Sequence, residues 1–449
     1  MQLARAVRNR TTGVLYVLDE PSIGLHPSNI VGLVGVMRDL VSDGNSVVLV
    51  DHDAQILSVS DWIVEMGPGA GADGGRVIAR GTVEEIAENP QSRIGPYLRE
   101  GKKESLRPRA AEGELFALGE IHLSTEGIHT VKPLEISFPK GRLTAVTGVS
   151  GSGKTTLVLE SLVPGLDAHI RGKKLPAHVR AVRAEGIGQV KLIDATPVGI
   201  NVRSTVATYA DVHDELRKIF ARTSDAKALG YKAGDFSYNT GRLRCPVCDG
   251  TGTISLDVQF LPDVEIPCTE CRGSRYAQDA RRVCVGGRSG RRFSLPEVMS
   301  MDVRTALDEC RDMTLVCRRL QVLDELGLGY LTLGEETPGL SGGEAQRLKL
   351  ASEMGRAQQD SVFVFDEPTI GLHPLDVKTL VGVFQALIDR GATVVVIEHD
   401  LDVIRSADYV VDMGPGGGEE GGRIGAAGTP EEIASSPESL TGKFLRPLL

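Results

Sequence analysis

Short apolar runs separated by polar turns recur along the chain and predict buried strands rather than long apolar helices. Residues 46–50, 143–147, 362–365 and 393–397 are rich in valine and other β-branched or aromatic residues and are bounded by turn-forming segments. Each run stops after about five residues, far short of the ~20 that a membrane-spanning helix needs. The first residues contain no apolar stretch of signal-peptide length. The pattern predicts a cytoplasmic globular protein without a membrane segment.

A block of ten residues occurs twice. Residues 18–27 read Leu-Asp-Glu-Pro-Ser-Ile-Gly-Leu-His-Pro, and residues 365–374 read Phe-Asp-Glu-Pro-Thr-Ile-Gly-Leu-His-Pro, a displacement of 347 positions. The same displacement pairs His52 with His399 and holds from residue 3 to residue 98 without insertion or deletion. Such an extended match indicates a duplicated domain.

The second copy extends further upstream than the first. Leu340-Ser341-Gly342-Gly343-Glu344 stands just before the position equivalent to residue 1, so its counterpart would precede Met1. We therefore expect residues 1–100 to be the C-terminal part of one domain and residues 114–449 to be a whole second domain. Basic residues and proline at 101–113 interrupt any apolar period and predict a linker.

A phosphate-binding loop is predicted at residues 148–155. The segment Gly-Val-Ser-Gly-Ser-Gly-Lys-Thr fits G-x-x-x-x-G-K-[ST] and lies between the predicted strand 143–147 and a helix-like segment 156–160. Glycines let backbone N–H groups close around phosphates, Lys154 would reach the β- and γ-phosphates of ATP, and Thr155 would offer a hydroxyl to Mg²⁺. The predicted nucleotide contacts of this loop are Gly148, Gly151, Ser152, Gly153, Lys154, Thr155 and Thr156.

Two carboxylates follow the apolar run 362–365. Asp366 and Glu367 would stand at the strand end where open α/β sheets bind their ligands. Asp366 would hold the Mg²⁺ shell, and Glu367 would polarise the attacking water as a catalytic residue. In isolation such a pair is commonly a solvated strand end, but the phosphate loop upstream favours the catalytic interpretation.

Two further motifs resemble those of the ATP-binding-cassette (ABC) ATPases. Residues 340–344 are similar to the family signature, and His399, which follows the run 394–398, resembles the switch histidine. The resemblance implies an α/β fold of the ABC-type P-loop ATPase class. It also implies that Ser341, Gly342 and Gly343 cap a nucleotide held by another domain and that His399 takes part in catalysis. By itself, Leu-Ser-Gly-Gly could also be a helix-capping turn with Ser341 as the cap.

The spacing of the motifs predicts an inserted module. Lys154 and Ser341 are 187 positions apart, which is long for a minimal cassette, so we expect an insertion at about residues 200–325. Cys245, Cys248, Cys268 and Cys271 follow the spacing C-x2-C-x19-C-x2-C, typical of a closed structural zinc site within a module at residues 241–292. Reduced, metal-free thiols are the alternative. Core packing is expected for Cys284, Cys310 and Cys317, which lack the spacing.

Taken whole, the chain resembles the C-terminal half of the UvrA family, the A subunits of the bacterial nucleotide-excision-repair excinuclease. The matching stretches are residues 245–276, 329–351 and 366–374, followed by the Met413-Gly414-Pro415 turn. The resemblance implies an ATPase that binds double-stranded DNA, senses its distortion and hands the site to other excision-repair subunits. A UvrA-like paralogue that gives tolerance to a DNA-binding drug would share these motifs.

Two of the chain's departures from the family bear on its nucleotide sites. Ala195 stands where the family has a Mg²⁺-sensing glutamine, so the resemblance does not carry over to the rate or coupling of ATP hydrolysis. In addition, Asp19, Glu20 and His52 form half of a site without a phosphate loop of its own in this sequence. We expect that half-site to be completed by a missing N-terminal half or by a second copy of the chain in a head-to-tail homodimer.

Composition limits how DNA could be bound. The 449 residues contain 60 acidic and 50 basic side chains, a net charge of −10, so a wholly basic binder is excluded. Residues 241–292 hold nine arginines against six carboxylates, a local excess that would suit contacts to phosphates. A solvated charged face is the competing interpretation. Aromatic residues are 4% of the chain, which favours reading of the DNA backbone or shape over base stacking.

Three functions remain open from the sequence. The first is a DNA-binding ATPase acting in damage recognition or drug tolerance. The second is a nucleotide-gated DNA-binding protein with weak ATPase activity, which the alanine at 195 favours. A third, the ATPase subunit of a transporter, is disfavoured because a zinc module has no role there.

Overall fold

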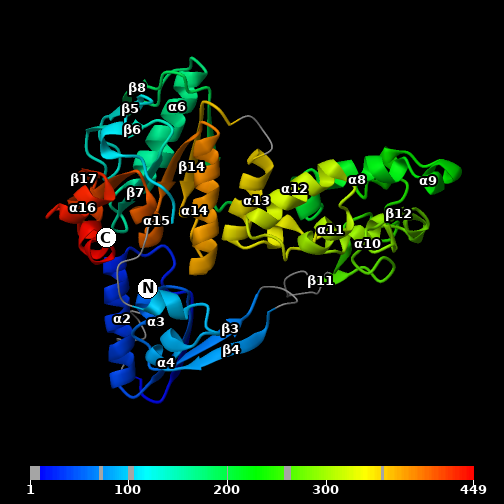
Figure 1. Cartoon of the computed structure of the whole chain (residues 1–449), viewed down its shortest axis with the longest axis horizontal. Helices are drawn as coiled ribbons and strands as arrows, with labels where there is room; N and C mark the ends of the chain where they lie inside the picture. Colours follow the sequence, from blue (N-terminus) through cyan, green and yellow to red (C-terminus); the bar gives the residue numbers. More distant parts are fainter. Residues whose placement is uncertain (1–10, 70–73, 100–105, 200, 257–263, 355–357) are drawn as a thin grey trace. The chain divides into compact units, whose positions relative to one another are not determined.

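The chain forms two compact units in the computed structural model, which describes residues 11–69, 74–99, 106–199, 201–256, 264–354 and 358–449 (Figure 1). Unit 1 comprises Met1–Ala195 and Gln358–Leu449, and unit 2 comprises Thr196–Ala357. The start of the repeat at residues 3–10, residues 101–105 of the predicted linker and the family-like residues 260–263 lie outside the described residues. The boundaries predicted for domains, linker and insertion stay predictions.

A six-stranded sheet forms the centre of the second copy in unit 1. Its strand order is β17-β16-β7-β15-β14-β9, and all neighbours are parallel except the β16–β17 pair. The strands are β7 (Leu143–Gly148), β9 (Gln189–Ile193), β14 (Ser361–Asp366), β15 (Thr393–Ile397), β16 (Tyr409–Gly414) and β17 (Arg423–Gly428). The central strands read as continuous apolar runs because both faces of a parallel sheet are covered. The predicted strands 143–147, 362–365 and 393–397 are therefore confirmed.

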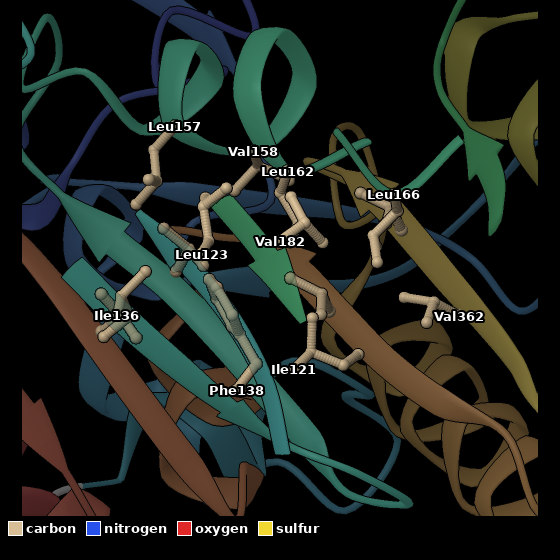
Figure 2. Packing of buried hydrophobic residues seen from close by; sticks show 14 of the residues in the cluster. Ile121, Leu123, Ile136, Phe138, Leu157, Val158, Leu162, Leu166, Val182 and Val362 are labelled. Carbon is tan, nitrogen blue, oxygen red and sulfur yellow. The ribbon is translucent and has the colours of Figure 1, made fainter. Parts of the chain in front are cut away.

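A smaller antiparallel sheet and a helix cover one face of this sheet. The smaller sheet has the order β6-β5-β8, with β5 (Glu120–Thr125), β6 (Leu134–Pro139) and β8 (Val179–Arg183). The chain after the phosphate loop is helical, but residues Thr156–Leu162 form a π-helix before α6 (Val163–Ile170) begins. Leu157, Val158 and Leu162 of that π-helix pack in one buried cluster with Leu123 and Phe138 of the small sheet (Figure 2).

The displacement of 347 positions also relates the elements of the two copies. In the first copy, β1 (Leu15–Asp19) pairs in parallel with β2 (Ser46–Val50), and β3 (Ile63–Gly67) pairs antiparallel with β4 (Arg76–Gly81). The antiparallel pairs β3–β4 and β16–β17 shift register at equivalent positions. The helices of the first copy are α2 (Pro27–Ser42), α3 (Ala54–Leu57), α4 (Val83–Glu88) and α5 (Gly95–Leu98). Those of the second copy are α14 (Pro374–Asp389), α15 (Leu401–Ser406), α16 (Pro430–Ser435) and α17 (Leu440–Leu445).

Helix starts in the two copies are specified by the same local chemistry. His26 and His373 cap α2 and α14, and in each case the imidazole Nδ1 accepts a backbone N–H two residues later, with proline at the first helical position. A threonine and a glutamate three residues later form a capping box at α4 and again at α16. Equivalent residues therefore start equivalent helices.

Unit 2 is mainly helical and carries two short hairpins. Its helices are α7 (Val206–Tyr209), α8 (Val212–Ala221), α9 (Ser224–Leu229), α10 (Leu295–Met299), α11 (Val303–Glu309), α12 (Thr314–Glu325) and α13 (Gly342–Met354). Its antiparallel pairs are β10 (Thr253–Leu256) with β11 (Val264–Pro267), and β12 (Cys284–Gly286) with β13 (Arg292–Ser294). Over the described part of the chain, no helix combines the length and apolar character needed to cross a membrane.

Candidate nucleotide site and four-cysteine cluster

The predicted phosphate loop lies between β7 and the π-helical segment and has a backbone that requires glycine. Gly148, Gly151 and Gly153 have φ angles of 130°, 78° and 99°, which L side chains rarely adopt. A Cβ on Gly148 would lie 2.1 Å from the carbonyl oxygen of Met413. The loop therefore packs directly against β16, with no space for a side chain at its first position.

Lys154 folds back over this loop. Its buried ammonium donates hydrogen bonds to the carbonyl oxygens of Gly148 (2.9 Å) and Val149 (3.1 Å). Burial lowers the pKa of Lys154 to about 8, although the carboxylates of Glu367, Asp412 and Asp366 act in the opposite direction. A partly desolvated ammonium can bind an anionic ligand strongly, and the carboxylates beside it would favour a ligand that brings a divalent cation.

The two carboxylates predicted from the sequence lie at the C-terminal end of β14. Asp366 is the last residue of the strand, and Glu367 follows in a left-handed conformation with φ 46°. Burial and the neighbouring charges of Glu367 and Asp194 raise the pKa of Asp366 to about 6. Asp194 directly precedes Ala195, the position at which the chain departs from the UvrA family, so that position belongs to the same strand-end region.

Glu367 and His399 are brought together. His399 follows β15, is buried, and places Nε2 3.5 Å from Oε1 of Glu367. Burial lowers the pKa of His399, whereas the contact with Glu367 raises it. The other ring nitrogen, Nδ1, is buried without a hydrogen-bond partner among the described residues. The geometry suits a neutral histidine beside a carboxylate. The catalytic roles of Glu367 and His399 stay predictions.

Glu398 is a residue of this site that the sequence interpretation missed. It is 1% exposed and accepts hydrogen bonds from the backbone N–H and hydroxyl of Thr369 and from the N–H of His399. In the first copy Asp51 accepts equivalent bonds from Ser22 and from the N–H of His52. The signal was present in the repeat, because an acidic residue and a hydroxyl residue recur at the same two positions.

The first copy contributes a related half-site that faces the second. Oε1 of Glu20 lies 3.7 Å from Nε2 of His52. The equivalent distance between Glu367 and His399 is 3.5 Å. A Cβ on Gly24 would lie 3.0 Å from Oε2 of Glu367, and one on Gly371 would lie 3.4 Å from Oε2 of Glu20. The two copies therefore exchange reciprocal contacts, as a pseudo-two-fold arrangement requires. A cavity of about 390 Å³ lies between them.

The signature-like segment belongs to unit 2. Ser341 stands before α13, and it exchanges hydrogen bonds with Glu344: the Ser341 N–H donates to the Glu344 carboxylate (2.7 Å), and the Glu344 N–H donates to the Ser341 hydroxyl (3.3 Å). This is a helix cap, as the alternative interpretation of the motif anticipated. Because Ser341 is also exposed, capping leaves it accessible to a ligand. The structure thus combines Lys154 with Asp366, Glu367 and His399 in unit 1, whereas Ser341, Gly342 and Gly343 lie in the other unit.

Four buried cysteines of unit 2 form a cluster with the dimensions of a tetrahedral metal site. The ligand atoms of Cys245, Cys248, Cys268 and Cys271 all lie within 4.8 Å of one another. Sγ atoms of the pairs Cys245–Cys268 and Cys248–Cys271 are 3.9 and 3.6 Å apart. A tetrahedral Zn–S₄ centre with bonds of about 2.3 Å has sulfur–sulfur edges of roughly 3.8 Å, so the residues fit zinc.

The surroundings of the cluster act differently on its thiols. Burial raises the pKa of Cys271 to about 12. Burial opposes ionisation of Cys248 as well, but the N–H of Gly252 and other hydrogen bonds outweigh it and bring the pKa of that thiol to about 7. Of the remaining cysteines, Cys310 is buried and Cys284 and Cys317 are half-buried, and none of the three joins the cluster.

The arginine-rich segment 241–292 is largely neutralised within unit 2. Ion pairs join Arg242 to Asp235, Arg244 to Asp249, Arg275 to Glu336, Arg282 to Asp279, Arg288 to Asp308 and Arg292 to Asp225. Arg291 lies over the ring of Phe293. Arg272 and Arg281 are exposed and form no ion pair within the described part of the chain, although the charge of Arg281 helps to lower the pKa of Glu297. The excess of arginines therefore overstates the positive charge that this segment presents.

Comparison with known proteins identifies relatives of this chain. No family model matches the chain. UvrABC system protein A of Thermus thermophilus is 44% identical over 449 residues, 99% of this chain and 46% of that protein. The Bacillus subtilis protein of the same name is 43% identical over 100% of this chain and 46% of its own length. The chain is homologous to the C-terminal half of UvrA. It spans about half the length of these relatives.

Solved structures agree with this relationship. A crystal structure of UvrA2 from Deinococcus radiodurans matches 100% of this chain and 53% of its own chain, with a TM-score of 0.88 and 40% identity. A model of ribosome-bound archaeal Pelota and ABCE1 matches with a TM-score of 0.51 at 18% identity, over 95% of this chain and 56% of that one, which supports the fold alone. The predicted ABC-type α/β fold and the resemblance to the C-terminal half of UvrA are confirmed.

Proposed function

We propose that this chain is the C-terminal half of a UvrA-type protein that binds and hydrolyses ATP and recognises damaged double-stranded DNA in nucleotide excision repair. The observation that carries the proposal is the contact between Glu367 and His399 beside a phosphate loop whose lysine is already turned inward. The similarity to UvrA proteins and to the UvrA2 structure supports the same assignment. A cytoplasmic location, other excision-repair subunits as partners and a role in drug tolerance remain predictions.

The residues of unit 1 fit ATP with Mg²⁺. Lys154 would exchange its carbonyl partners for phosphate oxygens, and the loop N–H groups would bind the remaining oxygens. A carboxylate and a hydroxyl are ligands that Mg²⁺ prefers, and Asp366 and Thr155 supply them. The metal would neutralise phosphate charge. Glu367 would orient the attacking water, and His399 would donate a hydrogen bond toward the γ-phosphate.

The four-cysteine cluster fits Zn²⁺ with a structural role. The thiolates Cys245, Cys248, Cys268 and Cys271 would complete a closed shell that leaves no open position for catalysis. Gly250 supports the turn after the first pair, since it has φ 79° and a Cβ there would lie 1.8 Å from the carbonyl oxygen of Tyr238. Zinc would thus stabilise unit 2 and the surface that we propose to contact DNA.

DNA contact is proposed for unit 2 through a small number of exposed arginines. Arg272 and Arg281 are exposed there, while most neighbouring arginines already pair with carboxylates. Contacts to phosphates by a few arginines would position the protein without reading bases. This fits a protein that senses the shape of DNA rather than its sequence.

An uncovered sheet face supports a proposed partner domain. Leu15, Val17, Val48 and Val50 on β1 and β2 are 51–68% exposed. Their counterparts in the second copy, on β14 and β15, are buried in the cluster beneath the π-helix. We propose that a matching α/β core with its own phosphate loop covers β1 and β2, supplied by an N-terminal half of a longer protein or by a second copy of the chain.

The test is ATP binding and hydrolysis with and without damaged duplex DNA. Lys154→Ala should weaken ATP binding, because it removes the positive charge that would bind the phosphates. Glu367→Gln should bind ATP nearly as the parent does and hydrolyse it slowly. Hydrolysis by the parent should respond to DNA. Equal losses of ATP binding in both variants would show that the role proposed for Glu367 is wrong. ATP binding with no measurable hydrolysis under any condition would favour the nucleotide-gated alternative.

A further inference from the structure

A buried histidine from the first copy packs against the predicted switch histidine of the second. The ring centroids of His26 and His399 are 5.8 Å apart in an edge arrangement, with an interplanar angle of 83°. Phe444 packs against His26 from another side, with centroids 6.1 Å apart. His26 is fully buried, so its ring fills space beside His399 that would otherwise be empty.

Hydrogen bonds fix the tautomer of His26. The Thr441 hydroxyl donates to Oδ1 of Asp412 over 2.9 Å and has no second proton to offer. In the 3.0 Å hydrogen bond between Thr441 and Nε2 of His26, the hydroxyl oxygen must therefore be the acceptor, so Nε2 carries the proton. Nδ1 is then the acceptor for both the N–H (3.2 Å) and the hydroxyl (2.8 Å) of Ser28 at the start of α2. Burial, with the nearby side chains of His399 and Lys154, lowers the pKa of His26 to about 3, which keeps the ring neutral.

His399 needs such a neighbour because its own hydrogen bonds hold it weakly. Its Nδ1 lacks a hydrogen-bond partner among the described residues, and its Nε2 is 3.5 Å from Glu367, longer than an ordinary N–H···O bond. The orientation of the ring therefore depends on the side chains packed around it. His26 is one of them and is itself held at both nitrogens.

We infer that His26 is a positioning residue, which holds His399 against Glu367 and is in turn oriented by Thr441 and Asp412. The inference rests on the proposed ATPase function and deepens it, because it links a residue of one copy to the catalytic pair of the other. His26 itself contacts neither the proposed nucleotide nor the attacking water. Its effect would pass through the orientation of His399.

The equivalent arrangement in the first copy lacks the same hydrogen bond. His373, the counterpart of His26, packs against His52 with centroids 6.1 Å apart. The counterpart of Thr441 is Ile94, which has no hydroxyl to accept a proton from His373. Glu65, the counterpart of Asp412, accepts instead from the Ser92 hydroxyl and the N–H of Ile94. The two related sites are therefore unequal, and the chain fixes the histidine that faces its own phosphate loop.

The experiment compares two substitutions that create the same residue at equivalent positions. Thr441→Val removes the hydroxyl with little change in volume, and Ile94→Val changes the matching position of the first copy. In Thr441→Val we expect kcat for ATP hydrolysis to fall roughly tenfold, with the KM for ATP unchanged, because orientation and not binding is altered. Thr441→Ser, which keeps a hydroxyl, should restore kcat, and Ile94→Val should match the parent.

A second readout separates this inference from the proposed function. Nitrogen NMR of labelled histidines should show His26 with the proton on Nε2 in the parent, and Thr441→Val should shift the ring signals of both His26 and His399. Unchanged His399 signals together with unchanged kcat would overturn the positioning role and leave the ATPase proposal intact. A parent that hydrolyses no ATP would overturn the proposed function, while the His399 signals would still decide whether His26 positions it.

Discussion

Glu398 holds Thr369 at two points: the backbone N–H and the hydroxyl of Thr369 each donate to the carboxylate over 2.9 Å. The same carboxylate accepts the N–H of His399, also over 2.9 Å. One buried side chain thus joins the loop that follows Glu367 to the residue predicted as the switch histidine. Burial, together with the charge of Asp400, raises the pKa of Glu398 to about 8. The hydrogen bonds from Thr369, His399 and Asp400 act in the opposite direction but do not offset the cost of desolvation.

Removing this carboxylate should destabilise unit 1. Glu398→Ala leaves several buried donors without an acceptor, and we expect a loss of roughly 3 kcal/mol in the free energy of unfolding. Asp51→Ala is the matched control, because Asp51 binds the equivalent groups of the first copy but is half-buried. There the loss should be about 1 kcal/mol, since water can replace the acceptor. Urea unfolding of both variants measures the difference. Equal losses of stability in the two variants would show that burial of the carboxylate does not determine the cost of removing it.

The cysteine cluster predicts about one zinc ion per chain in protein purified without chelator. Cys268→Ala should release the metal and make unit 2 more susceptible to proteolysis, because three thiolates cannot close a tetrahedral shell. Cys310→Ala is the control, since Cys310 is buried outside the cluster. Elemental analysis and limited proteolysis provide the measurements. Protein without zinc, or equal zinc loss in both variants, would refute the site.

A buried histidine in unit 2 predicts loss of stability in acid. The ring of His213 lies 2.7 Å from the hydroxyl of Tyr276, and burial, with the charge of Arg217, lowers its pKa from 6.5 to about 3. Between these values the unfolded chain binds the proton and the folded one does not. The contribution of neutral His213 to the free energy of unfolding is therefore fully present above about pH 6.5. It falls as the pH drops toward 3, by roughly 2 kcal/mol at pH 5.

His213→Gln removes this titration and keeps an amide donor for Tyr276. The variant should be less stable than the parent at pH 7.5, but the gap should narrow by pH 5. His169→Gln, at an exposed histidine, should follow the parent at both values. Urea unfolding of zinc-loaded protein at the two pH values tests this. A constant gap between His213→Gln and the parent would show that His213 is not the titrating group.

Local sequence patterns predicted what depends on local chemistry. The phosphate loop needs glycines at fixed intervals, and β14 ends in its carboxylates, so both were evident from short segments. The cysteine spacing likewise anticipated the cluster, because each pair lies on one turn. The π-helix at residues 156–162 was missed, since a helical pattern of apolar residues does not distinguish it from an α-helix.

Contacts between distant segments could not be predicted in the same way. The packing of His26 on His399 joins residues 373 positions apart and depends on how the two copies face each other. The ion pair between Arg292 and Asp225 could be found only from the fold. Asp225 lies outside residues 241–292, so a count of charges within that segment does not include it. Only the repeat offered a signal, through hydroxyl and acidic residues that recur at equivalent positions.

The final prediction concerns the completion of the nucleotide site. Resemblance to ABC ATPases implies that the signature acting on a nucleotide comes from another domain, and Ser341 is in unit 2 whereas Lys154 is in unit 1. If two chains pair head to tail, each would lend Ser341 to the other. We then expect ATP binding at any protein concentration, but a specific activity that rises with concentration.

Mixing two inactive variants provides the decisive form of this test. Ser341→Arg keeps the phosphate loop and loses the signature, and Lys154→Ala does the reverse. Random pairing in an equal mixture leaves one intact site in half of the dimers, so about a quarter of the parent activity should return. Each variant alone should remain inactive. Fast hydrolysis by a demonstrated monomer, independent of concentration, would refute a site shared between chains, because a lone chain would then complete its own site.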